Sequence, residues 1–371
     1  MLPATTRQIT THLAADGWLT ARVEDAPLPA PAASQVVVQV EAAPINPSDL
    51  GLLFGPADVE AGEFTPGMVR ARMGDGALRA FAARVGMTLP VGNEGAGTVI
   101  AAGSDAAAQA LVGRRVAAFV GGMYAQHRVI EAADCLLLPD DVSAREGAAA
   151  FVNPLTALAF VETMHAEGHK ALIHTAAASN LGQMLHRICA EDGIPLVNVV
   201  RKPEQAELLR GLGAAHVVDS SAPTFRDDLV SAITATGATM AFDAVGGGTL
   251  LGQIMGAMEK AANSGGSFAR YGSNSPKRGF IYGTLDPSPT VLNRNFGYVW
   301  DISGFLLAPM MEKLGAVARQ RMHTRVARSL KTTFANHYKA DVTLEAMLTR
   351  EAVLDYNARA TGAKYLVTPQ G

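Results

Sequence analysis

One stretch, residues 171–205, constrains the fold more than any other part of the chain. It reads ALIHTAAASNLGQMLHRICAEDGIPLVNVVRKPEQ and predicts an apolar strand, a tight turn, a helix and a second apolar strand. Units of this kind begin a dinucleotide-binding domain. Helical and strand patterns keep alternating to about residue 300, which predicts an α/β fold with a doubly wound parallel sheet.

The turn of this unit carries the small residues that a bound pyrophosphate requires. In the spacing G-x-G-x-x-G, the glycines permit a tight turn, close approach of the pyrophosphate, and packing of the helix on the strand. Ala177, Ser179 and Gly182 occupy that spacing here. Ser179 and Asn180 add polar side chains at a helix amino terminus, where phosphate is favoured. We therefore predict a dinucleotide site at this turn.

The end of the second strand indicates which dinucleotide is bound. NAD-binding units place an acidic residue there, about 20 residues after the glycines, to bind the ribose 2′-hydroxyl. Arg201 and Lys202 stand at that place, and the first carboxylate is Glu204. Two cations suit a 2′-phosphate, which arginine can bind bidentately. We predict NADPH as the cofactor; a solvated basic pair at a strand end is the alternative.

Composition and charge exclude other classes of protein. The net charge of −3 gives no indication of a nucleic-acid partner or an anionic membrane surface. No apolar run approaches the ~20 residues of a membrane helix, and the first residues lack signal-peptide order. Cys135 and Cys189 are too few for a disulfide framework or a multi-cysteine zinc site. We expect a cytoplasmic protein with neither a nucleic-acid nor a membrane partner.

The chain of 371 residues is long for one core, so two domains are expected. Residues 1–145 contain short β-branched runs separated by Gly, Pro and Asp, which predict a β-rich domain. Within it, residues 56–90 show helical spacing and are predicted to form a helical insertion. Ser143 and Glu146 have capping-box spacing, so a helix should begin there and open the second domain, residues 146–314.

Six motifs, taken in order, resemble one family of enzymes. They are INPSDL (45–50), GNEGAGTV (92–99), VNPLTAL (152–158), AAASNLGQ (176–183), VNVVRKPEQ (197–205) and FDAVGG (242–247). Together they resemble the zinc-independent medium-chain dehydrogenase/reductases, particularly the NADPH:quinone oxidoreductases and the 2-enoyl thioester reductases. The resemblance implies a GroES-like β-barrel domain completed by about 315–371, a Rossmann domain, an active site in the cleft between them, and a homodimer.

The resemblance also implies that no metal is bound. Zinc-dependent alcohol dehydrogenases share the fold, and the positions matching their catalytic zinc ligands hold Asn46, Asn93 and Val152 in this chain. None of these suits zinc, which takes Cys, His or carboxylate ligands.

Roles for individual residues follow from the same resemblance. As catalytic residues it implies Asn46, near the nicotinamide, and Thr156, bonded to the carboxamide. A turn hydrogen bond for Asn46 and a bond within its own helix for Thr156 are the structural alternatives. The implied cofactor-binding residues are Ala177, Ser179, Asn180, Leu181 and Gly182 at the pyrophosphate, Arg201 and Lys202 at the 2′-phosphate, Gly246, Gly247, Tyr271 and Gly272 at later strand ends, and Lys364 near the C-terminus.

One missing residue separates two reactions. Enoyl thioester reductases carry a tyrosine two residues after the glycine that follows INPSD, whereas Gly55 is followed here by Pro56 and Ala57. Reducing an enoyl thioester forms an enolate that needs a positioned donor. A quinone accepts hydride readily and needs mainly positioning. The sequence therefore favours a quinone or an activated α,β-unsaturated carbonyl acceptor, although Tyr298 is a candidate substitute donor.

Two other functions stay open at this point, namely a 2-enoyl thioester reductase and an NADPH-binding sensor or structural protein without turnover. The residues of the cleft motifs favour an enzyme, because a binding protein needs only the Rossmann half. The role of residues 56–90 is also open, either as a lid over the acceptor or as a surface insertion.

Overall fold

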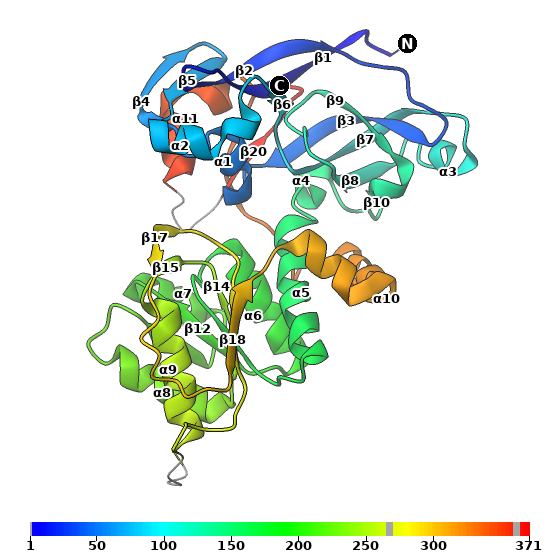
Figure 1. Cartoon of the computed structure of the whole chain (residues 1–371). Helices are drawn as coiled ribbons and strands as arrows, with labels where there is room; N and C mark the ends of the chain where they lie inside the picture. The colour runs from blue at the N-terminus through cyan, green and yellow to red at the C-terminus, as the bar shows by residue number, and fades with distance from the viewer. Residues whose placement is uncertain (1, 265–269, 359–363) are drawn as a thin grey trace. The chain divides into compact units, whose positions relative to one another are not determined.

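The computed structural model describes residues 2–264, 270–358 and 364–371, which form two compact units (Figure 1). Unit 1 comprises Met1–Val152 and His323–Gly371, and unit 2 comprises Asn153–Met322. The first break lies at the start of helix α5 (Val152–Ala166), and the second falls inside helix α10 (Leu307–Arg328). None of the helices in the described ranges combines the length and the apolar character needed to cross a membrane.

Unit 1 is built on mainly antiparallel sheets with the strand orders β4-β5-β2-β1-β6 and β10-β8-β7-β3-β20-β19, with β9 also paired to β3. Its strands are β1 (Thr5–Leu13), β2 (Trp18–Pro27), β3 (Gln35–Pro44), β4 (Asp58–Thr65), β5 (Met68–Arg72), β6 (Thr88–Pro90), β7 (Glu94–Ala102), β8 (Arg115–Phe119), β9 (His127–Glu131), β10 (Cys135–Leu137), β19 (Tyr338–Val342) and β20 (Lys364–Val367). Its helices and 3-10 turns are α1 (Pro47–Leu53), α2 (Asp75–Ala80), η1 (Ala82–Arg84), α3 (Ala106–Gln109), η2 (Ala132–Asp134), α4 (Ala144–Gly147), η3 (Ala346–Leu348) and α11 (Arg350–Asn357).

Strand β3 is the centre of unit 1. Its β-branched side chains Val36, Val38 and Val40 lie on one face of the strand and are buried in the core, as expected where such residues pack on a pleated surface. Gly97 allows β7 to lie close to β3, because a Cβ there would stand only 1.9 Å from the carbonyl oxygen of Gln39. Strand β3 also pairs with β9 and, at Ala43 and Pro44, with the C-terminal strand β20, which appears among the N-terminal strands in Figure 1.

Residues 56–90 are not the predominantly helical insertion that the sequence predicted. The first part is the hairpin β4–β5, which joins the sheet through β2, and only α2 and η1 are helical. In β5, buried Val69 and Ala71 alternate with more exposed neighbours, and Gly67 supplies the positive φ of the turn. A run of five residues is too short to separate a period of two from helical spacing, which explains the error.

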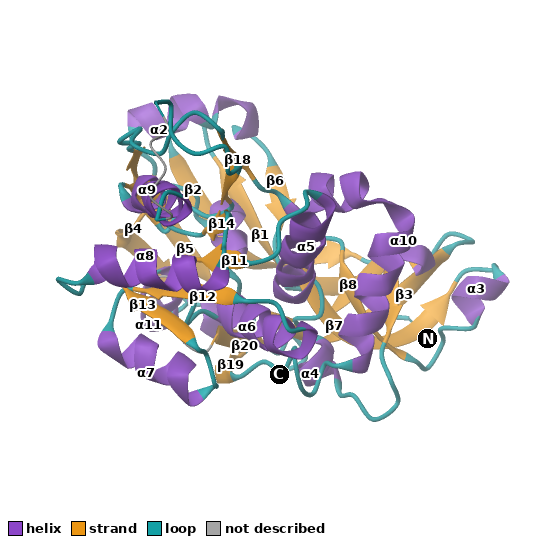
Figure 2. Ribbon diagram, turned by 90° about the horizontal axis from the view of Figure 1, so that it is seen from below, coloured by secondary structure: helices purple, strands orange, loops and turns teal. Residues whose placement is uncertain are grey.

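Unit 2 is the doubly wound α/β domain that the sequence predicted. Its six-stranded parallel sheet has the order β13-β12-β11-β14-β16-β18, and a small second sheet pairs β15 with β17. Helices α6, α7 and α8 pack beside β12 and β13 (Figure 2). The elements not yet given are β11 (Leu172–His174), α6 (Asn180–Asp192), β12 (Leu196–Val200), α7 (Pro203–Gly211), β13 (His216–Asp219), α8 (Phe225–Thr236), β14 (Met240–Asp243), β15 (Gly246–Gly248), α9 (Leu250–Ala262), β16 (Lys277–Ile281), β17 (Asp286–Thr290) and β18 (Trp300–Gly304).

An aromatic stack holds the centre of this sheet. The ring of Phe242, on β14, lies 3.9 Å from that of Phe160 and 5.1 Å from that of Phe280, measured between centroids. Phe305 meets it edge-on at 5.4 Å. Since Phe242 is fully buried, these contacts join α5 to two neighbouring strands.

We therefore expect Phe242→Ala to reduce the free energy of unfolding of the protein by about 3–5 kcal/mol, the usual result of emptying a buried phenylalanine site. Urea denaturation followed by circular dichroism measures this loss. Leu208→Ala, at a position 46% exposed in the same unit, is the control and should change stability by less than about 0.5 kcal/mol. Equal losses for both variants would contradict the assignment of Phe242 to the core.

Candidate functional site

The turn between β11 and α6 has the tight geometry that its small residues predicted. Ala176 has a φ of 49° and is the one non-glycine residue with positive φ in the described part of the chain. Ser179 caps α6, its Oγ accepting a bond from the Gly182 backbone N–H at 3.2 Å. A Cβ on Gly182 would lie 2.2 Å from the Ala177 carbonyl oxygen. A positive φ at a residue other than glycine, as at Ala176, is a strained backbone conformation. It persists where the surrounding structure imposes it, often at ligand sites.

Arg201 and Lys202 follow β12 and are both exposed. Their backbones are fixed, because the Arg201 N–H donates to Gln205 and Lys202 is the N-cap of α7. Neither side chain makes a recorded hydrogen bond or ion pair with any residue of the described ranges. Two unpaired cations thus stand at the carboxyl end of β12, where parallel α/β sheets bind ligands.

A second turn, which follows β14, lies at the same carboxyl edge of the parallel sheet, and the sequence predicted only some of its residues. Gly246 and Gly247 lie after the carboxyl end of β14, as expected, and Gly246 has a φ of 80°. Asp243 was not predicted from the sequence; it holds this turn by accepting hydrogen bonds from the Gly246 N–H at 3.1 Å and from the Thr175 hydroxyl at 2.6 Å. An Asp shortly before Gly-Gly is a turn signal that could have revealed it.

Tyr271 and Gly272 were predicted at the wrong place. The strand expected at SFARYG (267–272) lies partly outside the described residues, and the described strand that pairs with β14 on the side away from β11 is β16, which begins at Lys277. Residues 267–269 lie outside the described residues, and Tyr271 and Gly272 are in the turn before β16. In a parallel sheet this is the amino edge, opposite the ligand edge. Both residues therefore lie away from the strand ends at which they were expected.

Tyr298, the candidate substitute donor, also lies at the amino edge of the sheet and so away from the ligand edge. It precedes β18, is 80% exposed and has its ring against Tyr271, with centroids 6.3 Å apart.

The remaining predicted residues of unit 2 lie on two helices. Thr156 is buried within α5, and Asn180 and Leu181 form the first turn of α6.

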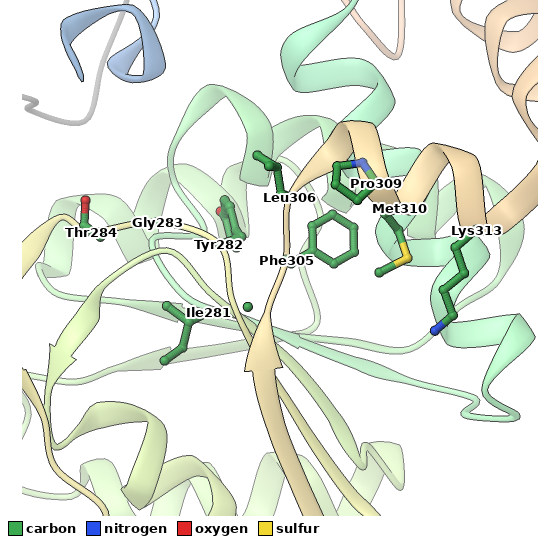
Figure 3. A pocket seen from close by; sticks show the side chains of 10 residues that line it. Ile281, Tyr282, Gly283, Thr284, Phe305, Leu306, Pro309, Met310 and Lys313 are labelled. Atoms are coloured by element: carbon green, nitrogen blue, oxygen red, sulfur yellow. The ribbon is translucent and has the colours of Figure 1, made fainter. Parts of the chain in front are cut away.

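A pocket of about 610 Å³ lies at the carboxyl ends of β16 and β18 (Figure 3). This pocket was not predicted, because the sequence pattern did not reveal strand β16. Tyr282 forms part of its wall and shares a hydrogen bond of 2.7 Å with the Nε2 of His174. Burial lowers the pKa of His174 to about 3, so this imidazole is neutral. The pocket is lined mainly by apolar groups: Ile281, Tyr282, Gly283, Thr284, Gly304, Phe305, Leu306, Pro309, Met310 and Lys313.

In unit 1, Asn46 is the centre of a buried polar cluster. Its backbone N–H donates to Asp49 Oδ2 at 2.8 Å, which is the turn hydrogen bond considered as an alternative role. Its side chain does more, because Nδ2 donates to Glu94 Oε1 at 2.8 Å while Oδ1 accepts from Lys364 Nζ. Lys364 reaches this place because β20 pairs with the end of β3, where the Ile45 N–H donates to the carbonyl of Tyr365.

The two carboxylates of the cluster accept backbone donors. Asp49 Oδ1 accepts from the Asn93 N–H at 2.7 Å, and Glu94 Oε2 accepts from the N–H groups of Phe151 and Val152 at 2.8 and 3.0 Å. Burial raises the pKa of Asp49 to about 7 despite these donors. Burial also raises the pKa of Glu94, against the attraction of Lys364. No grouping of three or more His, Cys, Asp or Glu suited to a metal ion occurs among residues 2–264, 270–358 and 364–371.

A β-rich unit completed by the C-terminal strands, together with a doubly wound parallel sheet carrying a dinucleotide turn, defines the medium-chain dehydrogenase/reductases. The chain is similar to members of this family. Residues 32–140 match the alcohol dehydrogenase GroES-like domain, and the predicted combination of a GroES-like and a Rossmann-like domain is confirmed.

Individual members show which proteins the chain resembles. A crystal structure from Mesorhizobium loti, assigned by its name to the NADPH:quinone reductases, is 28% identical and covers 100% of both chains with a TM-score of 0.75. Bovine mitochondrial enoyl-[acyl-carrier-protein] reductase is 31% identical over 50% of this chain and 45% of its own. Acrylyl-CoA reductase of Ruegeria pomeroyi is 31% identical over 41% of this chain and 47% of its own. The chain thus spans about half the length of the curated relatives it matches.

The buried Asp49 makes the stability of unit 1 depend on pH. Because its pKa is raised on folding, the folded state binds this proton more tightly than the unfolded state does. Its contribution is therefore fully present below the unfolded pKa near 4 and is lost as pH rises towards about 7. Wild-type stability should fall relative to Asp49→Asn between about pH 4 and pH 7, by up to ~1.4 kcal/mol per pH unit. Urea titrations across this range measure the difference, and parallel curves for the two proteins would contradict it.

Proposed function

We propose that the protein is a zinc-independent, NADPH-dependent oxidoreductase that transfers hydride to a quinone or another activated α,β-unsaturated carbonyl compound. The observation that carries the proposal is the pair of unpaired cations, Arg201 and Lys202, at the strand end that selects the cofactor. The full-length likeness to the Mesorhizobium loti protein, whose name specifies NADPH and quinone, supports it.

The residues of unit 2 fit this cofactor. The turn Ala177–Gly182 has no room for a Cβ at Gly182 and offers the N-terminus of α6 to the pyrophosphate. Arg201 and Lys202 would bind the 2′-phosphate, and the turn of Gly246 and Gly247 lies along the same edge. Thr156 remains the candidate for the carboxamide. When bound, NADPH supplies the hydride, and the protein supplies its orientation.

The acceptor is assigned from two features. The pocket beside β16 and β18 is mainly apolar, which suits an uncharged conjugated ring. The tyrosine expected of enoyl thioester reductases is replaced by Ala57, so the donor that such a reaction requires is missing from that position. Enoyl thioester reduction is the second candidate, because the two curated relatives named above carry that activity in their names.

We also propose that the protein acts as a homodimer in the cytoplasm on small-molecule substrates. The edge position of β18 in the parallel sheet supports a dimer, because an exposed edge strand is a ready surface for pairing with a second copy. Sedimentation equilibrium measures this state directly.

Oxidation of NADPH should be followed against an ortho-quinone, a para-quinone, an α,β-unsaturated ketone and a crotonyl thioester, with NADH in parallel. Turnover of quinones or the ketone with NADPH supports the proposal. Preference for the thioester would show that the second candidate is correct. NADPH binding without any turnover would favour a sensor or structural role.

Removing the two cations tests the cofactor assignment separately. Arg201→Ala/Lys202→Ala should raise the Kd for NADPH by about 100-fold, since two exposed charge-assisted contacts at about 1.5 kcal/mol each contribute about 3 kcal/mol together. The Kd for NADH should stay unchanged, because NADH lacks the 2′-phosphate. Arg226→Ala, an exposed arginine of α8 in the same unit, is the matched control. Equal weakening of NADH and NADPH binding would contradict the assignment.

A further inference from the structure

Lys364 is the cation of the buried cluster in unit 1, and most of its hydrogen-bonding capacity is unused. An ammonium group has three N–H donors, and within the described residues Lys364 spends one of them, on Asn46 Oδ1. No carboxylate of those residues lies within ion-pair distance of its Nζ. Among the described residues nothing occupies its other two charged donors, which leaves them for a ligand.

The other polar groups of the cluster are less suited to bind an anion. Asp49 and Glu94 are acceptors already bonded to backbone N–H groups. The hydroxyl of Tyr124 donates to the carbonyl of Pro44 at 3.1 Å. Asn46 lies between Glu94 and Lys364, so its amide is oriented by both and keeps one uncharged N–H free.

Glu94 favours the positively charged form of Lys364 and so opposes the effect of burial. Its carboxylate accepts three hydrogen bonds, from Asn46, Phe151 and Val152, which favour the ionised form. Burial lowers the pKa of Lys364, whereas Glu94 and Asp49 raise it. Discharging the lysine would leave Glu94 buried without compensation, at a large cost in free energy.

We propose that Lys364 is a catalytic residue that donates a hydrogen bond to the negatively charged oxygen of the reduced acceptor, and that Asn46 and Glu94 are the residues that position it. The proposal rests on the function proposed above. It changes the role expected for Lys364 from cofactor binding to stabilisation of the acceptor anion, and the role of Asn46 from direct contact to positioning.

The chemistry of hydride transfer explains why such a group is needed. Hydride leaves NADPH, which becomes NADP⁺, and adds to the conjugated acceptor with its electron pair. The acceptor oxygen then carries a negative charge until it takes a proton from water. A charged donor at that oxygen stabilises the anion and the transition state that leads to it. Lys364 could fill the place of the tyrosine that this chain lacks near Gly55.

The first test distinguishes a role of Lys364 in reduction of the acceptor, measured by kcat, from a role in cofactor binding, measured by the Kd for NADPH. Lys364→Met should lower kcat by about 100-fold, the usual loss for one such donor, while the Kd for NADPH stays unchanged. Lys339→Met is the matched control, since Lys339 lies on the adjacent strand β19 and pairs with Asp355; its kcat should not change. Weakened NADPH binding with normal kcat would overturn the proposal and restore the cofactor role.

If Lys364→Met does not fold, a double variant that removes one positive and one negative charge from the buried cluster keeps the test valid. Lys364→Met/Glu94→Gln removes both charges, which avoids an uncompensated buried carboxylate. It should show the same loss of kcat with a normal circular dichroism spectrum. Recovery of wild-type kcat in this double variant would show that the lysine acts only by balancing Glu94, and would overturn the proposal.

The pH profile gives a readout that a structural role would not change. The kcat of the wild type should fall at high pH as Lys364 loses its proton, and Lys364→Arg should keep its activity there because arginine stays protonated. Titratable or charged groups near Lys364 are Glu94 on β7, Asp49 on α1, Tyr124 before β9, Tyr338 on β19, and Arg145, which stacks on Tyr338. An identical fall in Lys364→Arg would assign the titration to one of these groups.

Binding of p-nitrophenol tests the anion site without any turnover. Its phenolate resembles the reduced acceptor, and its absorbance reports ionisation. In complex with the wild type it should titrate at least about one pH unit below the free phenol, as expected beside a cation, and Lys364→Met should abolish this shift. An inactive enzyme that retains the shift would refute only the proposed function. Absence of a shift in the wild type would refute the role of Lys364.

Discussion

The antiparallel pairing of β20 with β3 is the interaction on which the rest of unit 1 depends. It brings Lys364 into hydrogen-bond contact with Asn46, a residue 318 positions earlier in the sequence. Without this pairing, Glu94 and Asp49 would be two buried carboxylates with no cation near them, an arrangement that costs several kcal/mol. The same pairing joins the C-terminal strand to the sheet that is centred on β3. One contact therefore both extends the sheet and assembles its polar cluster.

The nucleotide unit could be predicted because its information is local. Within 171–205, the periods of strand and helix, the small residues of the turn, and the cations after β12 all lie within one short segment. Its geometry agrees with that reading, including the close approach at Gly182. The capping box at Ser143 is a local signal of the same kind, and the structure confirms it with a bond of 2.8 Å from the Ser143 N–H to Glu146.

The sequence pattern did not predict strand β16, because charged residues stand where a buried strand usually has apolar ones. Strand β16 begins with Lys277 and Arg278, which no strand template expects in the interior of a sheet. The structure accommodates Lys277 by pairing it with Glu259 at 2.7 Å, and Arg278 by pairing it with Asp301. Because this strand was missed, Tyr271 was placed at the ligand edge and the pocket around Tyr282 was not foreseen. The contact between Asn46 and Lys364 was equally hidden, because no local spacing encodes a pairing of the two chain ends.

The two units hold their cations in opposite ways, and this difference fits the ligands proposed for them. Arg201 and Lys202 are exposed and have no partner among the described residues, so their attraction for a phosphate would act through water, and salt would screen it over a Debye length of about 8–10 Å. Lys364 is partly buried and fixed through Asn46, where screening is weak and the effective dielectric constant is lower. An exposed pair suits a cofactor that must be exchanged in each cycle. A fixed, desolvated charge suits an anion that exists only during the reaction, because its donors need no reorganisation when the negative charge appears.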